Sequence, residues 1–215
     1  MTYDKACIDS DALVNLLALG CFGDALSCVG CVESCCFRLP SMVAQLKRAR
    51  WVGERWPRAD RKAMAEAAQR LPVLPPPEDI ATQGMLNLIE GIDIGDAYIL
   101  ARALEDPGLL VLTGDGRMIR ALHECSGTAD VCEALRGRVM FFPQIVGGLV
   151  NTLSVTEVEY RWRSAAPDTT SHRHKSLSIM FGSTSPTRSE EFWSGHDLQV
   201  AHVTAVCGDS WLYSL

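Results

Sequence analysis

The 215-residue sequence has no long apolar run and no leader-like start. No stretch approaches the ~20 consecutive apolar residues of a membrane-spanning helix. The start, "MTYDKACIDSD", lacks the basic and then apolar layout of a signal peptide. Hydrophobic residues make up 47% of the chain and charged residues 21%, which suits one sizeable core. We therefore expect a protein with no membrane association that stays in the cytoplasm.

Several catalytic motifs are also missing. The sequence contains no glycine-rich phosphate loop and no nucleophile turn around a Ser or Cys, and its five histidines form no triad pattern. These absences argue against a P-loop nucleotide hydrolase and against a serine or cysteine hydrolase.

The nine cysteines form no recognisable disulfide framework, because their number is odd and no export signal accompanies them. We expect reduced thiols. The densest group, "CVGCVESCC", spaces Cys28, Cys31 and Cys35 three and four residues apart, which suits either one stripe of a helix or a metal clip. A zinc site needs a second pair or nearby histidines, and the nearest histidine in sequence is His123. We therefore interpret these cysteines as small core residues.

The formal net charge of −6 argues against a chain that coats nucleic acid, but the charge is unevenly distributed. The segment 45–62 holds seven Lys or Arg and two acids, so it is strongly basic within an acidic chain. It also carries Trp51 and Trp56, and interleaved cationic and aromatic groups are typical of nucleic-acid contacts. The alternative interpretation is a solvated helix face.

Hydrophobic periodicity predicts alternating strands and helices up to residue 142. The stretch 6–9 predicts a strand before a helix capped by Ser10. Further strands are expected at 109–113 and 138–143. Helices are expected at 24–33, from Pro40 into the basic segment, and at 59–71, 80–89, 117–124 and 129–137, with one more that carries Asp96 in its first turn. This alternation favours a three-layer α/β/α fold around a central parallel sheet.

Beyond residue 142 the pattern changes. Residues 144–164 read as helical, 165–175 as a polar linker, and the last forty residues as two short helices. We therefore predict one domain over 1–142 and a helical C-terminal extension, 143–215, that packs on it. Trp162, Trp193 and Trp211 are interpreted as packing residues of this extension.

Three aspartates lie at the ends of predicted strands or at the start of a predicted helix. Asp9 follows the first strand, Asp115 follows the most apolar strand, and Asp96 lies in the first turn of a helix. All three converge if the strands are parallel. Clustered carboxylates raise one another's pKa unless a cation lies between them, so we expect a hard divalent ion, Mg²⁺ or Mn²⁺. Such ions serve phosphoryl chemistry.

These segments resemble the PIN domain nuclease family, which includes the toxin ribonucleases of bacterial toxin-antitoxin pairs. The resemblance rests on "CIDSDALVNLL", "GIDIGDAYILARAL" and "LTGDGRMIRAL", in that order, and spans about residues 5–142. It implies a parallel sheet flanked by helices, in which Asp9, Asp96 and Asp115 bind metal and act as catalytic residues for cutting RNA. It also suggests homodimers and an antitoxin or other protein partner.

The sequence departs from the family pattern at two places. Relatives usually carry a glutamate in the third helix, where "LPSMVAQLKRA" offers Gln45. A neutral amide cannot replace that charge, so Glu54 or another acid reaches the site, or the metal is held weakly, or catalysis has been lost. Gly116 and Arg117 stand where many relatives have a further polar or acidic group, and we expect Arg117 to contact a substrate phosphate instead.

Simpler roles exist for the acidic residues. Asp9 and Asp115 are also well placed as helix caps, and Asp93 and Asp11 are interpreted as capping or solvent-facing residues. Asp9 and Asp11 together match the "DxD" spacing of an acidic-pocket phosphatase or a receiver-like domain. No later Lys motif follows a strand, which argues against that alternative.

The leading sequence hypothesis is thus a metal-dependent ribonuclease of PIN-like type. Asp9, Asp96 and Asp115 are its expected site, and Lys47, Arg48 and Arg50 are expected to hold RNA. The narrower prediction is a toxin, although toxins of this family tend to be shorter than 215 residues. The alternative is a catalytically degenerate PIN-fold module that binds RNA or protein without cutting.

Overall fold

The structure is a computed structural model that describes residues 3–166, 175–181, 188–208 and 211–213. Its centre is a four-stranded, all-parallel sheet in the order β2-β1-β3-β4. The strands are β1 (Lys5–Ile8), β2 (Cys36–Arg38), β3 (Leu109–Thr113) and β4 (Val139–Phe141). All five residues of β3 are buried, as expected for a strand covered on both faces. The predicted α/β class with a parallel sheet is confirmed.

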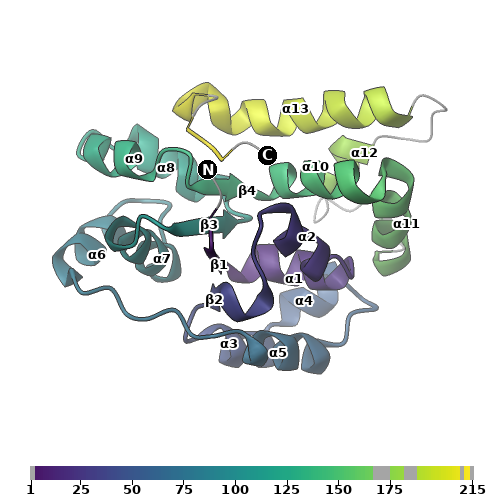
Figure 1. The fold of residues 1–215 in the computed structure, drawn as a ribbon, viewed down its shortest axis with the longest axis horizontal. Helices are drawn as coiled ribbons and strands as arrows, with labels where there is room; N and C mark the ends of the chain where they lie inside the picture. The colour runs from purple at the N-terminus through teal and green to yellow at the C-terminus, as the bar shows by residue number, and fades with distance from the viewer. Residues whose placement is uncertain (1–2, 167–174, 182–187, 209–210, 214–215) are drawn as a thin grey trace.

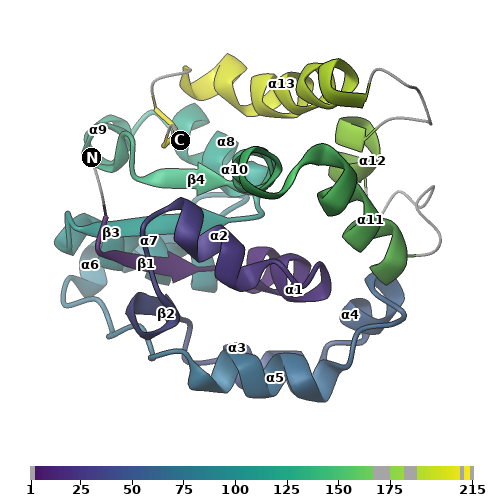
Figure 2. The same cartoon turned by 45° about the vertical axis from the view of Figure 1, so that its right-hand side comes forward.

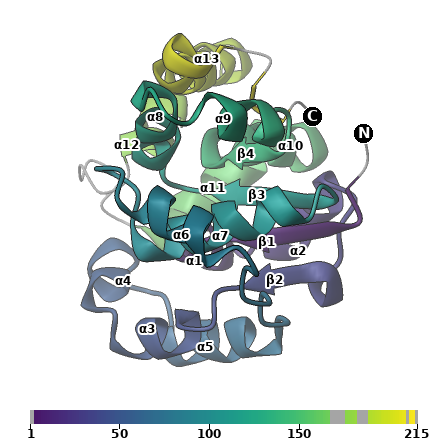
Figure 3. The same ribbon diagram turned by 90° about the vertical axis from the view of Figure 1, so that its left-hand side faces the viewer.

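Helices cover both faces of the sheet. Figures 2 and 3 show α1 and α2 on one side of it, and α6 and α7 on the other. Helices α3 to α5 lie beyond β2, and α13 lies at the opposite end of the molecule (Figure 1). The bounds up to β4 are α1 (Ser10–Ala18), α2 (Phe22–Cys28), α3 (Met42–Arg48), α4 (Arg50–Arg55), α5 (Arg61–Arg70), α6 (Ile80–Asn87), α7 (Ile94–Glu105), α8 (Gly116–Glu124) and α9 (Ala129–Leu135).

Several predicted helix limits need correction. The cap of α1 is Asp9 and not Ser10, because the Asp9 carboxylate accepts the backbone N–H of Ala12. The helix expected over 24–33 ends at Cys28, and a short 3₁₀ turn follows at Glu33–Cys35. The expected long basic helix is broken at Ala49, whose ψ of 99° is extended. These breaks change the direction of the chain between the elements.

The residues beyond β4 form four helices in the described part of the chain. These are α10 (Phe142–Leu153), α11 (Val155–Ala165), α12 (Lys175–Phe181) and α13 (Arg188–Cys207). The helix expected over 144–164 is divided at Ser154, which has a φ of 93°. Of the two short helices expected at the end, α13 has 20 residues. Residues 167–174 of the predicted linker lie outside the described residues.

The C-terminal helices pack against the rest of the chain. Helix α10 begins directly after β4, contacts α2, and supplies buried residues to the same hydrophobic cluster as the sheet. Helix α13 contacts α8 and α10. Trp162 and Trp211 are fully buried, as expected for packing residues, whereas Trp193 is half-buried.

Residues 211–213 pair with the β4 edge of the sheet. The backbone N–H of Gly137 donates to the carbonyl of Trp211 at 2.6 Å, and that of Tyr213 donates to Val139 at 2.8 Å. Tyr213 also makes an edge contact with Tyr3, with ring centroids 5.6 Å apart. Segments from the two ends of the described chain therefore meet at this edge, as Figure 1 shows.

In the described part of the chain, no single helix has the length and hydrophobicity needed to cross a bilayer. The pair α1 and α2 meets those criteria only jointly, with a bend of 117° between the two helices.

Candidate functional site

A cavity of about 930 Å³ opens at the carboxyl edge of the sheet. Its lining includes residues at the ends of all four strands: Leu39 after β2, Asp9 after β1, Gly114 and Asp115 after β3, and Phe141 at the end of β4. The first turn of α7, which carries the third predicted acid, also borders it. Parallel strands place their carboxyl ends together, and α/β proteins bind ligands at this edge. The three predicted acids therefore share one cavity.

Asp9 is the most buried of the three acids, with 7% of the residue exposed. Its Oδ1 accepts the N–H of Ala12 at 2.6 Å, which caps α1. Its Oδ2 accepts the hydroxyl of Thr113 at 2.6 Å and the N–H of Gly114 at 2.7 Å, which ties β1 to the end of β3. Burial raises the pKa of Asp9 to about 6, helped by the negative charge of Asp11 and opposed by these hydrogen bonds.

Asp96 is the third residue of α7. The side chain of Asp93 accepts the N–H of Asp96 at 2.9 Å, and Asp96 Oδ2 accepts the N–H of Asp93 at 3.3 Å, so the two residues form a capping box. Burial raises the pKa of Asp96 to about 7, and the negative charges of Asp93, Asp9 and Asp115 raise it further. The carboxylates are thus close enough to repel one another.

Asp115 is held by its own helix and by a neighbouring arginine. Its Oδ1 accepts the N–H of Arg117 at 2.7 Å and that of Met118 at 3.4 Å, which caps α8. The guanidinium of Arg117 donates to both carboxylate oxygens, at 3.2 Å and 3.0 Å. The capping roles considered for Asp9 and Asp115 are therefore confirmed. The structure places Arg117 on Asp115, with 80% of its side chain still exposed to solvent.

The cavity also contains a second acid–arginine pair. Asp11, in the first turn of α1, accepts a hydrogen bond from the guanidinium of Arg55 on α4. Asp93 caps α7, as expected. Two of the five acids in the lining are thus paired with arginines, whereas burial and then neighbouring negative charges raise the pKa values of Asp9 and Asp96.

The donor chemistry of Asp9, Asp96 and Asp115 fits a hard cation, because carboxylate oxygens are the ligands that Mg²⁺ and Mn²⁺ prefer. A divalent ion would also relieve the repulsion that raises the pKa of Asp96. Within the part of the chain that the structure describes, however, no three Asp, Glu, His or Cys side chains are grouped tightly enough to hold an ion as they stand. Binding would require the side chains of Asp96 and Asp115 to rotate toward Asp9, which its hydrogen bonds hold in place, and Asp115 would have to share its oxygens with Arg117.

Four of the nine cysteines are buried in the core, namely Cys7, Cys21, Cys31 and Cys36. Cys28 ends α2, Cys31 lies in the following loop and Cys35 ends the 3₁₀ turn, so the three do not share one helix stripe. All nine are free thiols. Cys31 is buried, and burial raises the pKa of its thiol. The interpretation as core residues holds for it, whereas Cys28 and Cys35 are only half-buried.

Helices α3 and α4 form the wall of the cavity on the β2 side. Gln45 lines it, and its side-chain oxygen accepts the hydroxyl of Ser10 at 3.3 Å. Trp51 and Arg55 line it too, and the guanidinium carbon of Arg55 lies 5.1 Å from the centre of the Trp51 ring. Trp56, by contrast, is fully buried and donates to Asn15.

The predicted RNA-binding cations are distributed differently from the acids. Lys47, Arg48 and Arg50 are all exposed, but none of them lines the main cavity. Arg48 lines a smaller adjoining groove, and Arg55, which was not among the predicted site residues, reaches the cavity itself. The basic segment is thus beside the site, with one of its arginines inside it.

The opposite wall of the cavity comes from residues that the sequence did not indicate. Helix α13 contributes Gln199, His202 and Val203, and α8 contributes Arg120. A Cβ atom added to Gly116 would lie 3.2 Å from the side chain of Val203. Helix α13 therefore packs tightly on α8 at this point. No local pattern marks these residues, because their position depends on how α13 packs.

Comparison of the chain with protein-family models, with curated proteins and with solved structures found no match.

Proposed function

We propose that this protein is a Mg²⁺- or Mn²⁺-dependent ribonuclease of PIN-like type that hydrolyses RNA phosphodiesters. The observation that supports the proposal is the convergence of Asp9, Asp96 and Asp115, from three distant segments, on one cavity at the carboxyl edge of the sheet. Burial and then the negative charges of Asp93, Asp9 and Asp115 raise the pKa of Asp96, and such a perturbed carboxyl in a cavity supports a site for a divalent cation. The three sequence motifs that resemble the family carry these same residues.

In this proposal Asp9, Asp96 and Asp115 hold the cation. When bound, the metal would activate water and stabilise charge on the phosphodiester. Asp9 is fixed by Thr113 and Gly114, so it provides a rigid anchor. Asp96 has the fewest protein hydrogen bonds of the three in the described structure, which leaves its oxygens most available.

The arginines around the acids suit the other half of the reaction, which is to orient an RNA phosphate. Arg117 and Arg120 border the cavity on α8, and Arg55 borders it on α4. A guanidinium presents paired donors to phosphate oxygens, which gives both attraction and orientation. The side chain of Arg117 is more exposed than that of Arg55. Its guanidinium can therefore leave Asp115 and bind a phosphate at little cost in free energy.

The narrower proposal is that the protein is a toxin of the toxin-antitoxin type, with an antitoxin or other protein as partner and homodimers in solution. The C-terminal helices would then be either a partner surface, a specificity element or a built-in regulator. The placement of Gln199 and His202 in the cavity wall supports a specificity role for α13.

A cleavage assay tests the enzyme proposal. Purified protein is incubated with labelled single-stranded RNA and Mn²⁺, beside an EDTA control and the variants Asp96→Asn and Asp115→Asn. Asparagine retains the capping capacity at position 115, so the charge is removed without losing the cap of α8. We expect each variant to cut at least ~100-fold more slowly, a larger loss than removal of an outer-sphere partner causes.

The control is Glu66→Gln, which removes a carboxylate from exposed α5, outside the cavity. It should cut at the wild-type rate. Equal cleavage by wild type, Asp96→Asn and Asp115→Asn, or cleavage that persists in EDTA, would contradict the proposal.

A second candidate function is a binding module with the same fold and no catalysis. It is favoured by Gln45, which places an amide where the resemblance calls for an acid, and by the Arg117 guanidinium on Asp115. The same assay separates the two: RNA binding that needs no metal, without cutting by any variant, supports the module.

A further inference from the structure

Trp51 lies between two hollows of the protein surface. It lines the main cavity and also a smaller adjoining groove of about 530 Å³. The groove lies along α3 and the start of α4, and it shares Ser10, Ser41 and Gln45 with the main cavity. The residue is 37% exposed, which is unusual for a tryptophan in this chain, since Trp56, Trp162 and Trp211 are buried. The two hollows are therefore continuous, with an indole ring at their boundary.

One face of the Trp51 ring is already occupied. The guanidinium carbon of Arg55 lies 5.1 Å from the ring centre, and the Arg55 guanidinium is held by the carboxylate of Asp11. Arg55 lines the main cavity but not the groove. The groove therefore meets Trp51 without the Arg55 guanidinium in its lining. The cation–π contact fixes the ring, so a planar ligand can stack on it with little loss of side-chain entropy.

The rest of the groove provides hydrogen-bonding groups in place of a purely apolar lining. Ser10, Ser41 and Gln45 contribute two hydroxyls and an amide, and Arg48 contributes a cation. The Gln45 side-chain oxygen accepts the hydroxyl of Ser10, so its amide N–H groups remain to donate. Glutamine amides pair readily with the polar edges of bases, and arginine suits a neighbouring phosphate.

We propose that this groove is a subsite for one unpaired nucleobase of the RNA, stacked on Trp51, with its edge at Gln45 and an adjacent phosphate at Arg48. The inference rests on the proposed function, because it assumes RNA in the main cavity. It assigns Gln45 a role in holding a base, which explains why an amide is useful at a position where the resemblance calls for a carboxylate. A paired base is unsuitable, because its edge is already hydrogen-bonded to its partner.

Binding measured in EDTA tests the subsite separately from cleavage. The probes are a labelled RNA hexamer and a hexamer of the same length whose internal nucleotides lack bases but keep ribose and phosphate. Affinity is read by fluorescence anisotropy, and stacking by quenching of tryptophan fluorescence. We expect Trp51→Leu to bind the intact hexamer about tenfold more weakly, because one stacked base is worth roughly that much. Its affinity for the baseless hexamer should be unchanged.

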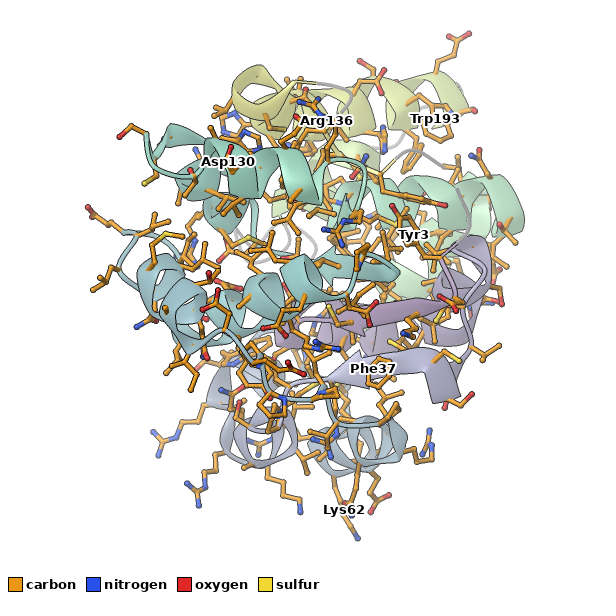
Figure 4. The ribbon with its side chains drawn as sticks, turned by 60° about the vertical axis from the view of Figure 1, so that its left-hand side comes forward. Tyr3, Phe37, Lys62, Asp130, Arg136 and Trp193 are labelled. Carbon is orange, nitrogen blue, oxygen red and sulfur yellow. The ribbon has the colours of Figure 1, made fainter. Side chains whose placement is uncertain are left out.

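Two further variants guard against misfolding and nonspecific charge effects. Trp51→Phe retains an aromatic face, so it should keep most of the affinity for the intact hexamer while the fluorescence quenching disappears. Arg136→Gln removes a cation outside the basic segment, at the opposite end of the molecule from Lys62 (Figure 4), and it should bind both hexamers as wild type does.

The outcomes distinguish this inference from the proposed function. Equal affinity of wild type and Trp51→Leu for the intact hexamer overturns the subsite, even where RNA is still cut with Mn²⁺. Failure of the wild type to bind the intact hexamer also overturns it. Binding that depends on Trp51, without any cleavage, supports the subsite and counts against the nuclease.

Discussion

Two of the walls of the cavity differ in character: the acidic wall, which Asp9, Asp96 and Asp115 form, and the α3–α4 wall. The acids are fixed by the backbone: Asp9 and Asp115 cap helices at strand ends, and Asp96 belongs to a capping box. The α3–α4 wall, with Trp51 and Arg55, consists of side chains on helix surfaces. The acids that hold the cation in the proposed function thus lie at positions that the fold itself defines. The α3–α4 wall can vary without disturbing the sheet, so substrate preference is more easily changed there.

Electrostatic compensation also differs between these walls. Arg55 on the α3–α4 wall is paired with Asp11, whereas burial and neighbouring acids raise the pKa of Asp96 to about 7. Ionisation of the acidic wall is therefore unfavourable in the absence of a cation. Each prediction below changes the charge of one wall and measures the effect.

The largest expected effect is on stability against pH. The pKa of Asp9 is raised to about 6 and that of Asp96 to about 7, both above the ordinary value of 3.8. The folded state therefore favours their protonated forms, so this stabilisation is complete below about pH 4 and is lost as the pH rises through 6 and 7. We expect the Tm to fall between pH 5 and pH 8 by about 8–16 °C, equivalent to ~4 kcal/mol.

The difference between wild type and Asp96→Asn isolates this contribution from other titrating groups, because the variant should show a shallower fall in Tm over the same range. Mn²⁺ added at pH 8 should raise the Tm of wild type more than that of Asp96→Asn. Glu66→Gln is again the control. Parallel Tm profiles for wild type and Asp96→Asn would show that ionisation of Asp96 does not destabilise the folded state.

The next effect concerns the arginine on the acidic wall. Arg117→Gln removes the guanidinium from both oxygens of Asp115 and should tighten Mn²⁺ binding about five- to tenfold by calorimetry. A unit charge ~4 Å away in a solvent-exposed setting is worth roughly 1 kcal/mol, which corresponds to that range. Arg136→Gln, which breaks an arginine–glutamate pair on the surface near α9, provides a matched control with no expected change. Weaker Mn²⁺ binding by Arg117→Gln would contradict the idea that Arg117 competes with the cation.

The smallest expected effect is on Mn²⁺ affinity when a carboxylate is added to the α3–α4 wall. Gln45→Glu adds a carboxylate at the cavity, and we expect Mn²⁺ to bind about threefold more tightly, since long-range attraction at an exposed position is weak. RNA binding in EDTA should weaken at the same time, because the base-holding amide is replaced by a negative charge. Unchanged Mn²⁺ affinity by calorimetry would show that this side chain does not reach the ion.

Much of the acidic wall could be predicted from the sequence because its signals are local. The run "LLVLTGD" identifies a buried strand that ends at an acid, and the structure has β3 over Leu109–Thr113 followed by Asp115. Parallel pairing then places the acid beside Asp9. The predicted helices at 59–71, 80–89 and 117–124 agree with α5, α6 and α8 within a few residues, because their apolar positions repeat at helical spacing.

The remaining features depend on packing between distant segments. The break at Ala49 redirects α4 so that Arg55 reaches Asp11. The local sequence does not predict this break. Trp56 belongs to the same basic segment as Trp51 but is directed into the core. Helix α13 reaches the cavity over more than eighty residues of sequence from Asp115, so its His202 could not be placed there by pattern alone.

The pairing of residues 211–213 with β4 has a consequence for how the chain is made. These residues are synthesised after every strand of the sheet, so the nascent protein keeps an open β4 edge until they leave the ribosome. An open edge with buried apolar neighbours is a template for wrong pairing between chains. A chain truncated before Trp211 should therefore aggregate, even though it contains every acid of the cavity.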